Sequence, residues 1–185
     1  MRRQIGLAAL AWIATANACK ENHWVPRGRA EIVLSELKLR GAAAVSRRID
    51  TDEEFSQSVI EGVASGDSVW LDVASQLKPT SAAAEASLDI ALASALPRAP
   101  HRVLALIGDE YPAEEVCGIP FLKADSNAVT AYYDQAVRAI SAVSDSALTG
   151  IVPLCRTALD SARSRRLQRI DPAYIKKNKP APARR

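Results

Sequence analysis

Residues 51–71 read TDEEFSQSVIEGVASGDSVWL and carry the clearest helix start and stop signals in the sequence. Its first half carries apolar residues at helical spacing, namely Phe55, Val59, Ile60 and Val63. Thr51 and Glu54 are predicted to form a capping box at the start of that helix. Gly66 suits the left-handed position just after a helix, and Asp67 is a favoured N-cap for the next one. The stretch therefore predicts two helices joined by a very short turn.

Similar start and stop signals predict further helices on both sides. They are expected over 29–44, 67–77, 80–97, 100–108, 125–143 and from 145 onward, with an irregular section over 108–125. Together they predict an all-α fold of about seven helices, either a compact bundle or a short helical-repeat array. The helix–turn–helix rhythm, with prolines at helix starts, resembles helical-repeat architectures such as HEAT over roughly 29–160.

Composition supports a helical body. The chain has 185 residues, which suits one domain. Apolar residues make up 48% of it but aromatic residues only 5%, and alanine is abundant. Helices that pack through small side chains fit this composition better than a β-sandwich, which favours β-branched and aromatic residues.

The N-terminus has the three parts of a secretory signal peptide. A basic start, Met1-Arg2-Arg3, precedes an apolar run that extends from Ile5 to Ala16, and Ala16-Asn17-Ala18 offers a small-x-small cleavage site. The run is short for a membrane span, and a buried N-terminal helix is the alternative. We therefore predict a signal peptide over 1–18 and a periplasmic or secreted protein.

Three cysteines bear on the compartment and on anchoring. In an oxidising compartment Cys117 and Cys155 are expected to form a disulfide, with two buried free thiols as the alternative. Cys19 follows the predicted cleavage site directly, which resembles the lipobox of bacterial lipoproteins. Ala18 fits that pattern, whereas Ala16 and Asn17 depart from it. Lipidation of Cys19 and ordinary cleavage that leaves a free thiol both stay open.

Charge divides the chain. Basic side chains dominate from Arg163 onward, whereas the body before it is acidic. We predict a lead-in or tether over 19–28, an all-α domain over 29–166 and a basic disordered tail over 167–185. The tail suits an anionic envelope surface or simply adds solubility. Nucleic acid is not expected as a partner, because Tyr174 is its only aromatic residue and stacking on bases needs more.

No catalytic, cofactor-binding or metal-binding pattern occurs in the sequence. The two histidines, His23 and His101, lack zinc-ligand spacing, and the nearest cluster joins His101 with Asp109 and Glu110. Neither a Gly-x-Ser-x-Gly motif nor a phosphate-binding glycine loop is present. We therefore expect no cofactor, no metal and no enzymatic activity.

The favoured function is that of an exported, non-catalytic protein that binds another protein. A signal peptide, a small helical body, one late disulfide and an acidic loop make residues 19–160 similar to the small periplasmic immunity proteins that neutralise cell-wall-targeting toxins. This resemblance implies a toxin as partner and an interaction surface in the acidic loop, at Asp109, Glu110, Glu114 and Glu115. The alternatives are an envelope-anchored lipoprotein with a structural role and an enzyme with dispersed residues.

Overall fold

The structure is a computed structural model that describes residues 27–121 and 125–170. All regular structure in these two ranges is helical, which confirms the all-α prediction. The predicted signal peptide, Cys19 and residues 171–185 of the predicted tail lie outside the described residues. No helix within the described ranges combines the length and the apolar character that a bilayer crossing requires.

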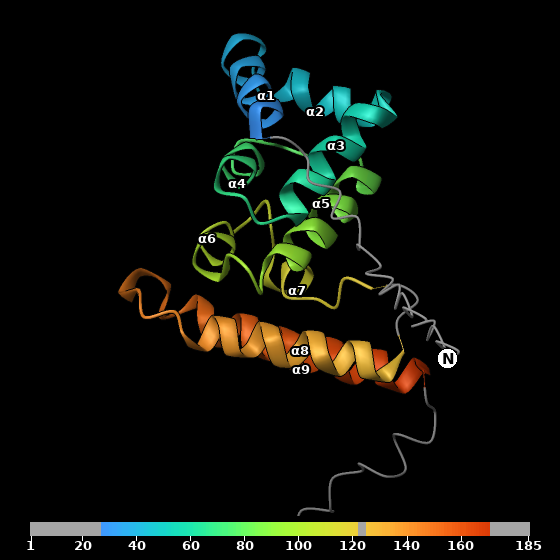
Figure 1. Cartoon of the computed structure of the whole chain (residues 1–185), viewed down its shortest axis with the longest axis vertical. Helices are drawn as coiled ribbons and strands as arrows, with labels where there is room; N and C mark the ends of the chain where they lie inside the picture. The colour runs from blue at the N-terminus through green and yellow to red at the C-terminus, as the bar shows by residue number, and fades with distance from the viewer. Residues whose placement is uncertain (1–26, 122–124, 171–185) are drawn as a thin grey trace, which may run out of the picture.

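The helices follow one another with short connections (Figure 1). In chain order they are α1 (Arg27–Arg40), α2 (Ala42–Thr51), α3 (Glu53–Ala64), α4 (Ser68–Ala74), α5 (Ala82–Ala95), α6 (Pro100–Leu104), α7 (Ala113–Val116), α8 (Ser126–Ser141), the 3₁₀ helix η1 (Ser146–Leu148) and α9 (Ile151–Ile170).

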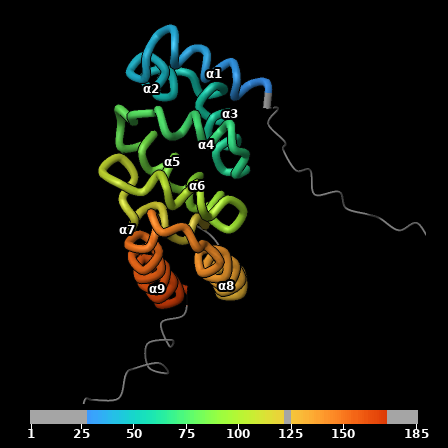
Figure 2. Tube along the Cα trace, turned by 90° about the vertical axis from the view of Figure 1, so that its left-hand side faces the viewer, coloured from blue at the N-terminus to red at the C-terminus, as the bar shows by residue number. Residues whose placement is uncertain are grey.

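The helices stack along the long axis of the molecule in roughly their sequence order. Figure 2 shows α1 and α2 at one end, α3 to α7 in the middle and the long pair α8 and α9 at the other end. Helix α3 packs closely on α5, α7 packs on both α5 and α9, and α8 lies along α9. The middle helices therefore separate the α1–α2 end from the α8–α9 end.

The core runs through the middle of this stack. Its largest fully buried side chains come mainly from α4, α5 and the turns that follow them, with further members in α6, α8 and α9: Trp70, Leu71, Leu77, Leu88, Leu92, Leu96, Leu104, Ile140 and Leu159. Alanines of α5, such as Ala91 and Ala95, are also buried and let neighbouring backbones approach closely. Packing through small residues matches the prediction from composition.

The turn between α3 and α4 is built as the sequence predicts. Gly66 adopts a left-handed backbone conformation with φ of 77°. The Asp67 side chain accepts a hydrogen bond from the Val69 N–H at 2.8 Å and caps α4. A Cβ on residue 66 would lie 3.4 Å from the Cβ of Arg98, in the connection between α5 and α6. The turn is therefore both conformationally demanding and closely covered.

Replacing Gly66 with valine is expected to destabilise the fold. A left-handed conformation costs an ordinary L-residue about 1–2 kcal/mol, and a β-branched side chain is among the least tolerant. We expect the thermal midpoint of Gly66→Val to fall by several degrees, whereas Gly66→Asn should lose clearly less because asparagine tolerates this conformation. Equal midpoints for wild type and Gly66→Val in differential scanning calorimetry would contradict this account of the turn.

Several local boundaries differ from the sequence prediction. The N-cap of α3 is Asp52, whose side chain accepts from the Phe55 N–H at 3.0 Å, and Thr51 ends α2 instead of forming a capping box. Gly41, with φ of 79°, separates α1 from α2, so the predicted helix over 29–44 is two helices. Each difference arises because a competing local signal, a better cap or a left-handed glycine, is satisfied in the structure.

The two ends of the predicted body also shift. Helix α1 begins at Arg27, inside the predicted lead-in, and α9 continues to Ile170, past the predicted boundary at 166. Leu167 is buried, so the last turn of α9 is packed against the body of the protein. The short helix α7 lies within the section that was expected to be irregular. The arginines near the end of α9 thus belong to a packed helix.

Candidate binding cleft

A cleft of about 460 Å³ lies between α5, α7 and α9. Its lining includes small and apolar side chains, among them Ala86, Ala93 and Ala162, which we call the floor. Its charged lining consists of Glu85 and Asp89 from α5, Glu114 and Glu115 from α7, and Arg165, Arg166 and Arg169 from α9. We refer to it as the Asp89 cleft. The view in Figure 1 shows the three helices that frame it.

Helix α5 presents Asp89 to the cleft because of its spacing. Ser81 is the N-cap of α5, and its hydroxyl accepts a hydrogen bond from the Ala84 N–H at 3.1 Å. The Asp50 side chain of α2 accepts hydrogen bonds from the hydroxyls of Thr80 and Ser81. Residues three and four apart share one helix face, which aligns Ala82, Glu85, Ala86, Asp89 and Ala93 along the cleft. The adjoining face of α5 enters the core.

Asp89 is a buried carboxyl that pairs with no cation among the residues that the structure describes. Its side chain lies in the wall of the cleft with only 7% relative exposure, and the Oδ1 atom is buried without a hydrogen-bond partner. Burial, and then the negative charges of Glu115 and Glu85, raise the pKa of Asp89 from 3.8 to about 6. A buried carboxylate that lacks a partner costs free energy, so this position is not optimised for stability alone.

The opposite wall carries cations that do not neutralise these acids. Within residues 27–121 and 125–170 no ion pair joins Glu85, Asp89, Glu114 or Glu115 to an arginine of α9. Arg166 donates a hydrogen bond to the main-chain oxygen of Phe121, and its Nε is buried without a partner. The cleft therefore holds carboxylates and guanidinium groups that face a common space without pairing.

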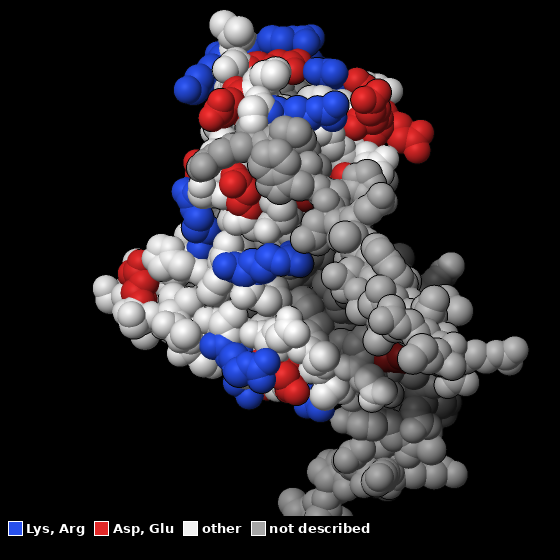
Figure 3. Space-filling view, in the orientation of Figure 1, with Lys and Arg blue, Asp and Glu red and all other residues white. Residues whose placement is uncertain are grey.

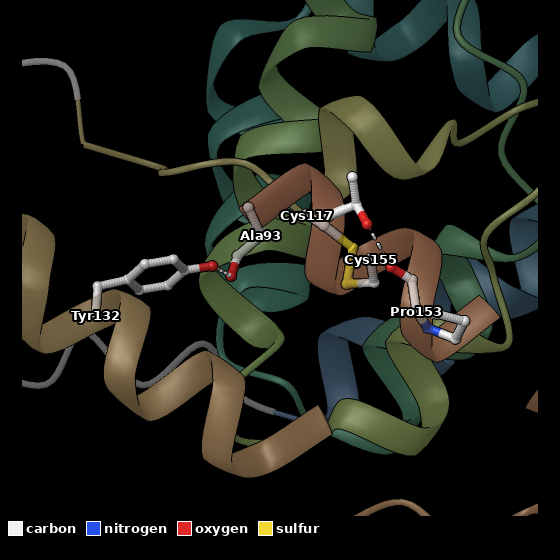
Figure 4. Close-up of a disulfide and its surroundings, with 6 residues drawn as sticks. Ala93, Cys117, Tyr132, Pro153 and Cys155 are labelled. Carbon is white, nitrogen blue, oxygen red and sulfur yellow. Dashed lines mark hydrogen bonds between the residues drawn. A yellow bond between two sulfur atoms is a disulfide. The ribbon is translucent and has the colours of Figure 1, made fainter. Parts of the chain in front are cut away.

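A disulfide fixes the two sides of this space. Cys117, the C-cap of α7, is bonded to Cys155 of α9, with their Cα atoms 5.3 Å apart (Figure 4). This confirms the predicted pairing. The same view shows Tyr132 of α8, whose hydroxyl donates to the Ala93 oxygen at 2.6 Å. These two links tie α7 to α9 and α8 to α5, so the walls of the cleft are held in register.

The structure separates the four acids of the predicted interaction surface. Glu114 and Glu115 lie on α7 and line the Asp89 cleft. Asp109 and Glu110 do not line it, and Glu110 forms an exposed ion pair with Lys78 at 3.5 Å. The acidic loop is thus two separate features, and of these the Glu114–Glu115 pair lines the Asp89 cleft whereas the Asp109–Glu110 pair does not.

His101 does not lie with the acids considered beside it in the sequence. Its Nε2 atom is 2.7 Å from Asp145 at the start of η1, and this contact links α6 to the segment before α9. The Ala147 N–H first, and then His101, lower the pKa of Asp145. Among the described residues no group of three or more His, Cys, Asp or Glu side chains is arranged to hold a metal ion.

A second charged cluster, at the α1–α2 end, is fully paired. Arg48 donates to Glu36 at 3.0 Å and to Asp52 at 3.1 Å, and its guanidinium lies 4.0 Å from the centroid of the Phe55 ring. Charged side chains of both signs gather at this end of the face shown in Figure 3. The Arg48 guanidinium is paired with two carboxylates and lies against an aromatic ring. These contacts join α1, α2 and α3, so the cluster has a structural role in packing these helices.

Sequence reasoning missed Asp89 and the arginines of α9 as site residues. The signal for Asp89 is a lone charge inside the apolar run 88–93, LDIALA. Arg165 and Arg166 fall at the end of the predicted all-α domain and Arg169 in the predicted tail, and in the sequence all three belong to the basic stretch from Arg163 onward. Only the tertiary structure brings them opposite α5.

Comparison with known proteins gave no relative for this chain: no protein-family model, no curated protein and no solved structure matches it.

Replacing Asp89 with asparagine is expected to stabilise the protein at neutral pH. Because the folded-state pKa is raised, the carboxyl favours the folded state below about pH 4, and this contribution is lost as pH rises through about 6. One pKa unit corresponds to about 1.4 kcal/mol, and since the amide needs partners of its own we expect a gain of about 1–2 kcal/mol.

This effect has a distinct pH profile. The difference in thermal midpoint between Asp89→Asn and wild type should grow from pH 4 to pH 7 and then level off. Glu53→Gln, at an exposed position in the first turn of α3, is the control and should show no such rise. A difference that does not change with pH would contradict the buried, unpaired state of Asp89.

Proposed function

We propose that this chain is an exported, non-catalytic interaction protein of a bacterial periplasm, and that it binds another protein through the Asp89 cleft. The observation that carries the proposal is the buried Asp89 carboxyl, which faces the arginines of α9 across a cleft without pairing with them. Buried charged groups without partners are destabilising, and a ligand that supplies the partners would offset this.

Two further features support this assignment. Disulfides persist in oxidising compartments, and Cys117–Cys155 agrees with the export that the N-terminal sequence predicts. The cleft is also rigid, because that disulfide and the Tyr132 hydrogen bond hold its helices together. A rigid site loses little freedom on binding, which favours specific recognition of one partner.

A narrower form of the proposal is an immunity-type inhibitor of a cell-wall-targeting toxin. In this form Glu114 and Glu115 belong to the inhibitory surface, because they line the cleft, whereas Asp109 and Glu110 do not. Anchorage of the protein through a lipid on Cys19 and contact of the basic tail with an anionic envelope surface stay predictions. Cys19 and residues 171–185 of that tail lie outside the described residues.

Charge reversal separates the two halves of the acidic loop and tests the proposal. The variant Glu114→Lys/Glu115→Lys changes the cleft, and Asp109→Lys/Glu110→Lys makes the same change in net charge outside it. Each tagged protein is cross-linked in a periplasmic extract, and captured proteins are quantified by mass spectrometry. We expect one partner to be recovered with wild type and with the Asp109/Glu110 variant.

Recovery of that partner with the Glu114/Glu115 variant should fall at least about tenfold, since a like-charge contact at an interface costs several kcal/mol. The Lys78–Glu110 pair lost in the control is exposed and contributes little to stability. Equal recovery with both variants would contradict binding through the Asp89 cleft. Circular dichroism confirms that each variant is folded before the comparison.

A further inference from the structure

We propose that the Asp89 cleft recognises a basic amino acid at a free carboxyl terminus, with the side-chain cation placed against Asp89 and the terminal carboxylate against the arginines of α9. This inference rests on the proposed function, because it names the part of the partner that enters the cleft. Peptide C-termini that end in lysine or arginine are the corresponding class of ligand.

The α5–α7 wall is suited to a cation. Asp89 lacks a partner for Oδ1, and the carboxyls that influence it most, Glu115 and Glu85, are themselves negative. A ligand ammonium or guanidinium group is what this wall lacks, since its positive charge would compensate the Asp89 carboxylate and relieve the repulsion among the three acids. An apolar or acidic side chain would leave the buried carboxyl unpaired.

The α9 wall is suited to a carboxylate. Arg165 and Arg169 lie one helical turn apart on the cleft side of α9, with Arg166 between them. Guanidinium groups bind carboxylates through paired hydrogen bonds that a neutral carbonyl cannot match in strength. Since the main chain of an internal residue offers only neutral carbonyls, three arginines favour a free C-terminus.

The space between the walls fits the remainder of such a residue. A volume of about 460 Å³ lies within the range of small-ligand sites. The alanines of the floor, with Ile119 beside them, offer an apolar surface. Lysine and arginine bury their methylene stems on surfaces of this kind while the charged end reaches a polar partner. The proposal therefore assigns the side-chain cation to the acidic wall, the methylene stem to the apolar lining and the terminal carboxylate to the basic wall.

Three short peptides test the two halves of the proposal. Acetyl-Gly-Ala-Lys with a free carboxylate is compared with its C-terminal amide and with acetyl-Gly-Ala-norleucine, which keeps the carboxylate but lacks the cation. Affinities for the full-length protein are measured by isothermal titration calorimetry at pH 7.5. We expect the amide and the norleucine peptide each to bind at least about tenfold more weakly than the lysine peptide, because each leaves one wall unpaired.

Protein variants assign each preference to its wall. Asp89→Asn should abolish the preference for lysine over norleucine and leave the preference for the free carboxylate. Arg165→Gln/Arg169→Gln should do the reverse. Arg47→Gln, at an exposed position of α2 on the other end of the stack, is the control and should bind all three peptides like wild type.

The pH dependence provides a second readout. The groups around Asp89 that can titrate or carry charge are Glu85 on α5, Glu114 and Glu115 on α7, Tyr111 before α7, and Arg165, Arg166 and Arg169 on α9. Burial raises the pKa of Tyr111 far above neutrality, so it stays uncharged. Lysine-peptide affinity should therefore rise between pH 5 and pH 7 in wild type and change much less in Asp89→Asn.

The inference is overturned if the three peptides bind equally, or if none binds at about 5 mM to protein whose circular dichroism is native. Such a result leaves the capture experiment intact, because that experiment depends on Glu114 and Glu115 and not on any peptide. Partner recovery that still depends on the cleft would then show that the proposed function holds and that the ligand class is wrong. If the peptides show no preference and partner recovery is also equal for the two charge-reversal variants, the proposed function is contradicted as well.

Discussion

Gly62→Ala is expected to lower the free energy of unfolding by about 3 kcal/mol, although it adds a single methyl group. Gly62 is buried in α3, where the helix backbone lies directly on the indole ring of Trp70. A Cβ at this position would come within 2.3 Å of the ring atoms Cδ2 and Cε2. Trp70 is 1% exposed, so the ring is enclosed by the core and any movement would have to displace its neighbours.

The size of this effect follows from two opposing contributions. Alanine is a better helix former than glycine by about 1 kcal/mol, which alone would stabilise α3. Inserting an extra carbon into a closely packed core costs about 1–3 kcal/mol, and more where the neighbour is a rigid ring that cannot adjust. Separation of α3 from α4 is the only relief, and it would disturb the centre of the core. The packing cost therefore dominates.

Thermal unfolding followed by circular dichroism measures the change. For a chain of this size a loss of about 3 kcal/mol corresponds to a fall in the midpoint of roughly 6–12 °C. Gly28→Ala is the matched control, because Gly28 lies in helix α1 and nothing lies within 4 Å of its added Cβ. That variant should be neutral or slightly stabilised.

A double-mutant cycle identifies Trp70 as the cause. In a Trp70→Leu background the ring is absent, so Gly62→Ala should cost little or become favourable, which gives a coupling energy of about 3–4 kcal/mol. A Gly62→Ala protein with the wild-type midpoint, or an equal loss in both backgrounds, would show that α3 and Trp70 are not packed as described.

Removing the disulfide is expected to cost about 3–4 kcal/mol. Cys117 and Cys155 are 38 positions apart, and the chain-entropy relation gives this value for a loop of that length. Both cysteines are fully buried, so alanine at these positions keeps an apolar environment and changes the volume little. The variant Cys117→Ala/Cys155→Ala should therefore unfold at a midpoint lower by roughly 6–16 °C.

Reduction of the wild-type protein gives an independent form of the same measurement. Dithiothreitol should shift the wild-type midpoint close to that of the double-alanine variant, and it should leave the variant itself unchanged. A midpoint that does not respond to dithiothreitol, with reduction verified by alkylation and mass spectrometry, would contradict a stabilising role for the disulfide. Because the bond joins α7 to α9, its loss should also weaken ligand binding at the Asp89 cleft.

Local signals made much of the helical framework predictable from sequence. Asp67, Ser81 and Asp125 cap helices as their chemistry suggests, and Pro100 begins α6. Such signals act over a few residues, so they are visible without knowledge of the fold. The disulfide was predictable because the sequence predicts export, and two cysteines in the body of the chain offer one pairing.

The remaining differences have a common physical origin. Thr51 and Asp52 are adjacent and both suit an N-cap, and it is the Asp52 side chain that accepts the hydrogen bond from the Phe55 N–H. The Asp89 cleft was not predictable, because it depends on how α5, α7 and α9 pack together. A lone aspartate in an apolar run indicates that a charged side chain lies on a buried helix face. It does not indicate which residues of other helices lie opposite that side chain. The arginines of α9 are far from α5 in sequence, and they line the same cleft only because of the tertiary fold.

The ordered stacking of the helices has a consequence for how the protein opens. Stacked helices are stabilised mainly by their neighbours, so an end of the stack with a single neighbouring layer opens most easily. Helices α1 and α2 form such an end, whereas α8 and α9 are tied to the middle by a covalent cross-link. Amide protons of α1 and α2 should therefore exchange with solvent well before those of α5 and α9. The cleft thus lies in the part of the molecule that stays closed longest.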